Sequence, residues 1–224
     1  MIFAYCDEAS NETIKLKGEL YKHLIKARRA VVNDEIVLKK LDDVESYYHY
    51  TIKSIEPRFA VLVLQRCSTC STKTSSTSLH VGWCQIDPKS VESVLGSLNE
   101  LGVDKITFIT CERSQKNFKI QKSRLEKILI NSNQQCGRDT FMKFDYASSL
   151  LSFIENNPDS TLFDFSENVC NDFSGIKTFI VGCEGGFTQN ERNFLKQLKV
   201  YKLDTKTVLR SQSAVLGICS KILL

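Results

Sequence analysis

Three of the ten glycines fall within five consecutive residues, Gly182-Cys183-Glu184-Gly185-Gly186, between an apolar run and a helical pattern. In a parallel α/β sheet this place is the carboxyl end of a strand, where ligands bind. Glycines allow backbone amides and carbonyls to approach a ligand there, because no Cβ stands in the way. The spacing is neither the G-x-G-x-x-G of a dinucleotide site nor the G-x-x-x-x-G-K-[ST] of a phosphate cradle. It favours a ligand loop of another kind, with a plain tight turn as the alternative.

A basic segment is the second feature with chemical meaning. The 224 residues carry 30 Lys plus Arg and 26 Asp plus Glu, a formal net charge of +4. The segment from Arg113 to Lys143 alone has eight basic and two acidic residues, a net charge of +6. Such a local excess is typical of proteins that bind a polyanion such as nucleic acid, and a solvated Lys-rich helix face is the alternative. The modest total excludes a histone-like tail and an acidic disordered chain.

The nine cysteines are irregularly spaced, and the chain opens without the basic and apolar regions of a signal peptide. We therefore expect reduced thiols in a cytoplasmic protein, most of them serving as small core hydrophobes. The C-x-x-C pair, Cys67 and Cys70, lies in a Ser/Thr run with no second pair at zinc spacing, so we expect no metal site. No apolar run is long enough to span a membrane.

The hydrophobic pattern changes at a polar Ser/Thr-rich stretch. Residues 1–70 are predicted to form a small β-rich domain, a barrel or a sheet, and residues 71–78 a linker. Residues 79–224 alternate strands with helices, which predicts an α/β domain with a parallel sheet. In the first part we expect a helix over 18–29, with Leu20, Leu24 and Ala27 inward. The predicted strands are 35–38, 47–55, 59–64, 79–83, 105–110, 161–165, 177–181 and 200–203, and the predicted later helices are 88–101, 123–131, 148–156, 189–198 and 213–224.

The glycine-rich segment, together with four others, resembles a known family. Val181–Thr188 followed by Glu191 is similar to (I/V)GPEGG(F/W)(S/T)xxE, the signature of RsmE-type 16S rRNA (uracil-N3)-methyltransferases of the SPOUT class. Four further segments match the family in the same order along nearly the whole chain, and they are 18–36, 100–114, 135–138 and 203–214. The departures are Cys183 for the family's Pro, Gln212 for its Glu, Gly96-Ser97 for its Gln-Lys, and the absence of its N-terminal Arg.

The resemblance implies a C-terminal SPOUT trefoil-knot domain with a parallel sheet and a small N-terminal PUA-like β-barrel domain that binds RNA. It also implies S-adenosyl-L-methionine as the cofactor, bent within the knot, its adenine held by backbone groups and leucine side chains. The implied cofactor-binding residues are Phe165, Val181, Gly182, Glu184, Gly185, Gly186, Leu203, Leu209, Arg210, Ser211, Ser213 and Ala214.

The implied reaction is methylation of N3 of a specific uridine in 16S rRNA of the small ribosomal subunit. No His–Asp pair presents itself as a general base, so the base stays unassigned, and cationic donors are expected to stabilise charge on the uracil oxygens. The implied catalytic residues are Arg113, Arg138, Glu184 and Arg210. For the arginines, phosphate binding or salt bridging is the alternative, and for Glu184 it is capping of the following helix.

The resemblance further implies RNA contacts and a homodimer. The implied RNA-binding residues are Lys22, His23, Lys26, Arg28, Arg29, Arg113, Lys116 and Arg138. The dimer would form through the apolar face of the C-terminal helix, although a core helix would look the same. A second hypothesis is a catalytically weak or inactive RNA-binding protein of ribosome assembly with the same fold. A nucleotide hydrolase has no motif in its favour.

Overall fold

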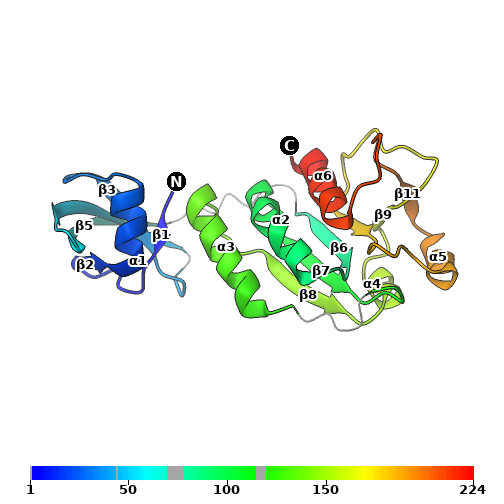
Figure 1. The fold of residues 1–224 in the computed structure, drawn as a ribbon, viewed down its shortest axis with the longest axis horizontal. Helices are drawn as coiled ribbons and strands as arrows, with labels where there is room; N and C mark the ends of the chain where they lie inside the picture. Colours follow the sequence, from blue (N-terminus) through cyan, green and yellow to red (C-terminus); the bar gives the residue numbers. More distant parts are fainter. Residues whose placement is uncertain (1, 44, 70–77, 115–119) are drawn as a thin grey trace. The chain divides into compact units, whose positions relative to one another are not determined.

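The structure, a computed structural model, describes residues 2–43, 45–69, 78–114 and 120–224 (Figure 1). The chain divides into two compact units, which are described separately below. The first consists of Met1–Thr74 and Asn133–Thr140, and the second of Ser75–Ser132 and Phe141–Leu224. The predictions made for Cys70, for linker residues 71–77 and for Lys116 lie outside the described residues.

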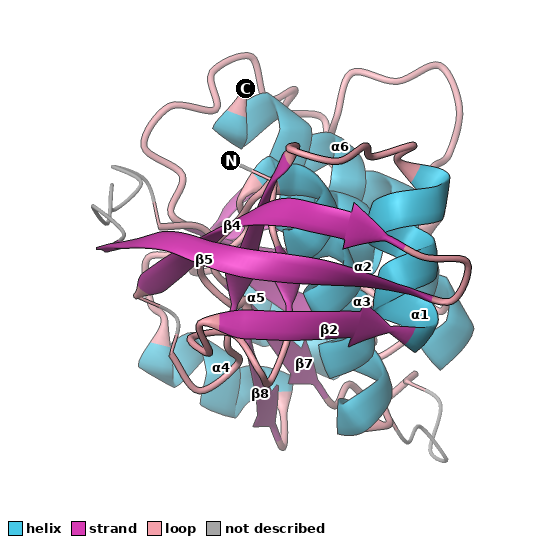
Figure 2. Ribbon diagram, turned by 90° about the vertical axis from the view of Figure 1, so that its left-hand side faces the viewer, coloured by secondary structure: helices cyan, strands magenta, loops and turns pink. Residues whose placement is uncertain are grey.

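The described part of the first unit is built on a five-stranded sheet of order β1-β3-β4-β5-β2. Neighbouring strands are antiparallel except for β1 and β3, and Figure 2 shows β2, β5 and β4 side by side. Tyr50 and Ile52 of β4 are buried, and Tyr48 is partly buried against the same core. The strands are β1 (Ala4–Tyr5), β2 (Thr13–Lys17), β3 (Glu35–Lys39), β4 (Ser46–Ile55) and β5 (Phe59–Thr69).

The predicted helix is present as α1 (Gly18–Tyr21), which continues directly into the π-helix η1 (Lys22–Ala27). Leu24 is buried as predicted, but the prediction for Ala27 is wrong, because Ala27 is exposed and Ile25 is buried instead. A π-helical turn closes i→i+5 hydrogen bonds, as Ala30 N does to Ile25 O, so residues three apart no longer share a face.

In the second unit the described strands form one six-stranded sheet of order β11-β9-β10-β6-β7-β8. Every neighbouring pair is parallel, which confirms the predicted α/β fold with a parallel sheet. Strand β8 was not predicted, because this edge strand alternates polar and aromatic residues and has no apolar run. The strands are β6 (His80–Cys84), β7 (Lys105–Ile109), β8 (Lys143–Ala147), β9 (Thr161–Phe163), β10 (Thr178–Val181) and β11 (Lys199–Tyr201).

Helices cover both faces of this sheet. Successive side chains of a strand point to opposite faces, and in β6 the Gly82 position faces Phe153 of α4 while Trp83 donates to Ser211 of α6. Helix α2 packs with α6, and α5 packs with α4 (Figure 1). The helices are α2 (Pro88–Leu101), α3 (Lys122–Cys136), α4 (Leu150–Asn156), α5 (Gln189–Leu195) and α6 (Ser211–Leu223).

Several element ends differ from the predicted ones. Helix α3 extends beyond residue 131 to Cys136, and residues 133–140 belong to the first unit, where Gln134 Oε1 accepts a hydrogen bond from Tyr5 N at 2.9 Å. Strand β9 ends at Phe163, so Phe165 lies in a loop with 74% of its surface exposed. Helix α6 begins at Ser211 rather than Ser213.

Six of the eight described cysteines are buried, which confirms that most of these residues serve the core. No helix of the described ranges is both long and apolar enough to cross a bilayer. Within the same ranges, no group of three His, Cys, Asp or Glu side chains is placed to hold a metal ion.

Gly82→Ala is expected to destabilise the protein by about 1–3 kcal/mol, because overpacking a core strains its neighbours. An added Cβ would lie 2.6 Å from Phe153 Cζ and 3.2 Å from Ile109 Cδ1. Gly96→Ala is the matched control: nothing lies within 4 Å of its added Cβ inside α2. There alanine should stabilise the helix by up to about 1 kcal/mol. Urea unfolding measures both, and equal stability of Gly82→Ala and the wild type would contradict this packing.

Candidate functional site

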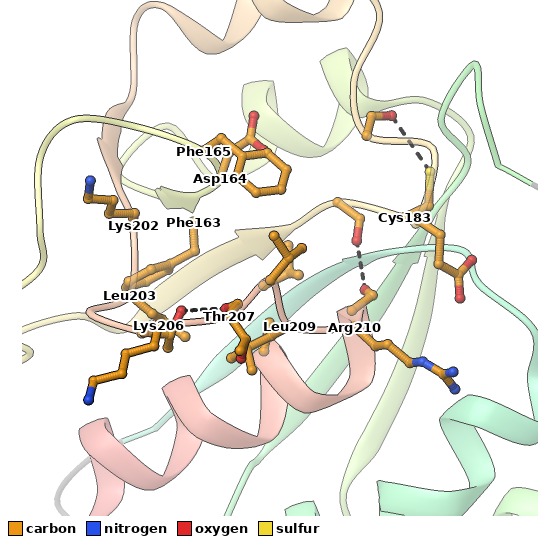
Figure 3. A pocket seen from close by; sticks show the side chains of 18 residues that line it. Phe163, Asp164, Phe165, Cys183, Lys202, Leu203, Lys206, Thr207, Leu209 and Arg210 are labelled. Atoms are coloured by element: carbon orange, nitrogen blue, oxygen red, sulfur yellow. Dashed lines mark hydrogen bonds between the residues drawn. The ribbon is translucent and has the colours of Figure 1, made fainter.

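A cavity of about 520 Å³ lies at the carboxyl ends of β9, β10 and β11. Three segments far apart in the chain form its wall: residues 163–165 after β9, the glycine loop 181–186 after β10, and residues 202–211 between β11 and α6 (Figure 3). The carboxyl edge of a parallel sheet is where open α/β domains bind ligands. The cavity is therefore the candidate site.

Ten of the twelve residues predicted to bind the cofactor, all of them described, line this cavity. Gly185 and Ser213 do not line it. Eight further residues line the cavity: three flank predicted residues at the ends of β9 and β10, and five stand in the loop after β11, whose sequence has no regular pattern. The lining residues that were not predicted are Phe163, Asp164, Cys183, Lys202, Thr205, Lys206, Thr207 and Val208.

Ser211 links the start of α6 to the glycine loop through a side-chain hydrogen bond. Its Oγ donates to Gly182 O at 2.7 Å and accepts from Trp83 Nε1 at 2.9 Å. Trp83 is fully buried and Ser211 is 7% exposed, so both hydrogen bonds lie in the interior. A hydroxyl donates and accepts at once, which this position requires.

The glycine loop turns sharply before α5. Gly186 has φ +62°, a conformation that favours glycine, and its N–H donates to Cys183 O at 2.9 Å. Thr188 caps α5, with its Oγ1 accepting from Glu191 N at 3.3 Å. The alternative role for Glu184 as the helix cap is therefore wrong, and Glu184 is an exposed side chain on the cavity wall.

Of the four predicted catalytic residues, Arg113, Glu184 and Arg210 belong to the second unit and Arg138 to the first. Arg113, which follows β7, donates from Nη1 to Gly185 O at 2.8 Å. Arg210 lines the cavity, and in Figure 3 its guanidinium points away from Leu203 and Leu209. Arg138 belongs to the first unit, where its Nε donates to Thr140 Oγ1 at 3.1 Å.

The cavity combines apolar side chains with open main chain and a few charges. Leu203 and Leu209 contribute half-buried apolar surface, and the glycines of the loop leave backbone groups accessible. Of the two acids on the wall, Asp164 is paired, since Arg192 Nη1 donates to its Oδ2 at 2.8 Å. Such a mixed lining suits a flat aromatic ring that carries a polar tail.

Two buried cysteines, Cys183 on the cavity wall and Cys84 in β6, have raised pKa values. Burial raises the pKa of the Cys183 thiol, and burial together with the Cys111 thiol raises the pKa of Cys84 well above its ordinary value. Cys84 Sγ lies 2.6 Å from Cys111 Sγ. Because only the thiolate is a strong nucleophile, the raised pKa values disfavour Cys183 and Cys84 as nucleophiles.

Five of the predicted RNA-binding residues lie in the first unit, on and just after η1. Lys22, Lys26, Arg28 and Arg29 are exposed, and His23 is half-buried. Arg28 Nη2 lies 3.3 Å from His23 Nε2, within hydrogen-bond distance. The arrangement presents four exposed cations along η1 and the two residues that follow it.

Comparison with known proteins identifies the class and then the family. Residues 73–223 match the RNA methyltransferase domain family. The chain is 32% identical over 226 residues to ribosomal RNA small subunit methyltransferase E of Helicobacter pylori strain J99, with 98% of each chain covered. The chain therefore belongs to the RNA methyltransferases, and among them to the small subunit rRNA methyltransferase E family, which confirms the resemblance seen in the motifs.

Solved structures share the fold. A probable rRNA-methyltransferase from Porphyromonas gingivalis aligns with a TM-score of 0.71 at 18% identity, covering 98% of this chain and 95% of that one. Ribosomal RNA small subunit methyltransferase E from Neisseria gonorrhoeae, solved bound to S-adenosyl methionine, aligns with a TM-score of 0.69 at 21% identity and the same coverage.

Ser211→Ala is expected to lower the free energy of unfolding by about 1–3 kcal/mol, because it leaves Trp83 Nε1 and Gly182 O buried without their partner. Ser211→Thr keeps the hydroxyl and should recover most of the loss. Ser213→Ala, at an exposed position two residues on, is the control and should stay within about 0.5 kcal/mol of the wild type. Chemical unfolding measures all three, and equal stability of Ser211→Ala and Ser213→Ala would refute the role of Ser211.

Proposed function

We propose that this protein transfers the methyl group of S-adenosyl-L-methionine to N3 of a specific uridine in 16S rRNA of the small ribosomal subunit. The observation that carries the proposal is the cavity at the carboxyl edge, whose glycine loop and 203–214 segment are the ones that match the family motifs. The relatives named for small subunit rRNA methylation cover nearly the whole chain.

The cavity residues fit the cofactor. The volume of about 520 Å³ lies within the usual range for small-molecule sites. Leu203 and Leu209 would pack against the faces of the adenine, and backbone groups of Gly182–Gly186 would bind its edge and the polar tail. Lys202 and Arg210 line the cavity, and either cation would form an ion pair with the carboxylate of the cofactor's polar tail. When bound, S-adenosyl-L-methionine supplies an electrophilic methyl group on a positively charged sulfur.

The remaining chemistry concerns the uracil. N3 must lose its proton before it can accept a methyl group, and the negative charge then spreads over the uracil oxygens. Arg113, Arg138 and Arg210 are proposed to stabilise that charge as hydrogen-bond donors. The exposed Glu184 carboxylate is proposed either to orient one of these arginines or to receive the N3 proton.

We further propose the finer architecture of the family for this chain. Residues 1–70 would form a PUA-like RNA-binding domain, residues 71–78 a linker, and residues 79–224 a SPOUT domain with a trefoil knot. The knot rests on the family resemblance; the chain returns from the edge strand β11 to α6, which packs against β10. The target uridine would leave its stack to reach the cavity.

The proposed assembly is a cytoplasmic homodimer that contacts RNA through both units. Val215, Ile218 and Cys219 of α6 are buried in the core of the chain itself, so a dimer would use the half-buried Leu216 and Leu223 beside them. The proposed RNA-binding residues are Lys22, His23, Lys26, Arg28, Arg29, Arg113, Lys116 and Arg138.

The activity is tested in cells by reverse transcription of 16S rRNA. A methyl group at N3 blocks the pairing edge of uracil and stops the polymerase, so deletion of the gene is expected to abolish one stop and the intact gene to restore it. Calorimetric titration with S-adenosyl-L-methionine is the companion measurement. Absence of binding, with a stop that persists in the deletion strain, would contradict the enzyme and favour a non-catalytic RNA-binding protein.

Lys26→Ala combined with Arg28→Ala is expected to weaken binding to 16S rRNA and to flatten its salt dependence. Each lost phosphate contact removes about 0.7–0.9 from the slope of log K against log salt, so the slope should fall by about 1.5. Lys53→Ala, at an exposed position of β4 outside the proposed RNA face, is the control. A double variant with the slope of the Lys53→Ala control would remove η1 from the RNA-binding surface.

A further inference from the structure

We infer that Glu191 is a positioning residue, whose buried carboxylate fixes the segment after β7 against the glycine loop and so sets the place of Arg113. The inference rests on the proposed function, because Arg113 is one of the proposed catalytic residues. Glu191 itself does not line the cavity, so it would act only through the loops that it joins.

The Glu191 carboxylate joins two loops that are distant in sequence. Its Oε1 accepts from Glu112 N at 2.8 Å and its Oε2 accepts from Thr188 N at 2.9 Å. Glu112 follows β7, and Thr188 follows the glycine loop at the start of α5. The side chain is only 5% exposed, so the hydrogen bonds from both amides compensate a charge removed from water. Opening either loop would leave that charge without one of its donors.

Arg113 is held against the glycine loop by a second set of contacts. Its Nη1 donates to Gly185 O at 2.8 Å, and a Cβ added to Gly185 would lie 3.1 Å from Arg113 Cβ. The turn that carries Arg113 is closed by Ser114, whose Oγ accepts from Cys111 N at 3.1 Å. Arg113 thus lies on a short closed turn. The residue directly before it, Glu112, is hydrogen-bonded to Glu191, which lies just after the glycine loop.

The link to Glu112 is separable from helix capping. A capping box at α5 needs only the reciprocal hydrogen bonds between Thr188 and Glu191. The bond from Glu112 N to Oε1 is additional and reaches across to another strand end. Glutamine at position 191 offers one carbonyl oxygen in place of two, so its amide NH₂ would face one of the two donors. Glu191→Gln also removes the negative charge that strengthens both bonds, so it weakens the link to Glu112 together with the cap, while Thr188→Ala weakens only the cap.

The test compares Glu191→Gln with Thr188→Ala in methyl transfer to small ribosomal subunits that lack the modification. Glu191→Gln is expected to lower kcat at least about tenfold, because small displacements of catalytic groups have effects of this size. KM for the subunits and Kd for S-adenosyl-L-methionine should change less than about twofold. Thr188→Ala should keep kcat within about twofold at a similar loss of thermal stability. In an Arg113→Ala background, Glu191→Gln should add little further loss.

Amide hydrogen exchange at Glu112 tests the link without the enzyme assay. Exchange should be at least about tenfold faster in Glu191→Gln than in the wild type, and unchanged in Thr188→Ala. Ser114→Ala removes the hydroxyl that accepts from Cys111 N and so weakens the turn that carries Arg113. It should lower kcat as Glu191→Gln does, and it replaces Glu191→Gln in the test if that variant does not fold. Any of three results would overturn the inference. These are unchanged exchange at Glu112 in Glu191→Gln, equal kcat for Glu191→Gln and Thr188→Ala, and additive losses of kcat when Glu191→Gln is combined with Arg113→Ala. A wild-type protein that transfers no methyl group but shows the expected exchange would refute the proposed function alone.

Discussion

The hydrogen bond from Ser211 Oγ to Gly182 O is the constraint on which the candidate site depends. It ties the start of α6 to the end of β10, while Trp83 of the next strand donates to the same hydroxyl. Because these groups are buried, breaking the contact would leave polar atoms without partners. The chain between β11 and α6 must therefore return across the carboxyl edge of the sheet, and residues 202–210 then form one wall of the cavity.

Much of the second unit could be predicted from local pattern, because its strands and helices are bounded by strong signals. Asp87 accepts from Ser90 N at the start of α2, and Gly102 ends that helix with φ +103°. The place of the glycine loop follows from a general rule, since it comes after a buried strand of a parallel sheet. Five motifs in the same order indicated the family, and the similar protein from H. pylori confirms that the chain belongs to it.

Other features could not be predicted, because they depend on contacts between distant residues. Glu112 and Glu191, 79 positions apart, meet only once β7 and α5 are in place. The π-helical turn at 22–27 moves Ile25 rather than Ala27 into the core, which the regular helical period does not foresee. Residues 133–140, which include the predicted Arg138, belong to the first unit, although 133–136 are the end of a helix that begins in the second.

We propose that the cavity at the carboxyl edge serves methyl transfer to N3 of uridine in small-subunit rRNA. The most direct measurement incubates the purified protein with unmodified small ribosomal subunits and S-adenosyl-L-methionine carrying a labelled methyl group, followed by mass spectrometry of the nucleosides. We predict labelled N3-methyluridine at close to one per subunit, and its loss in Leu209→Asp, which places a charge on the apolar wall. Label on a ribose or on another base, or no label in the presence of bound cofactor, would contradict it.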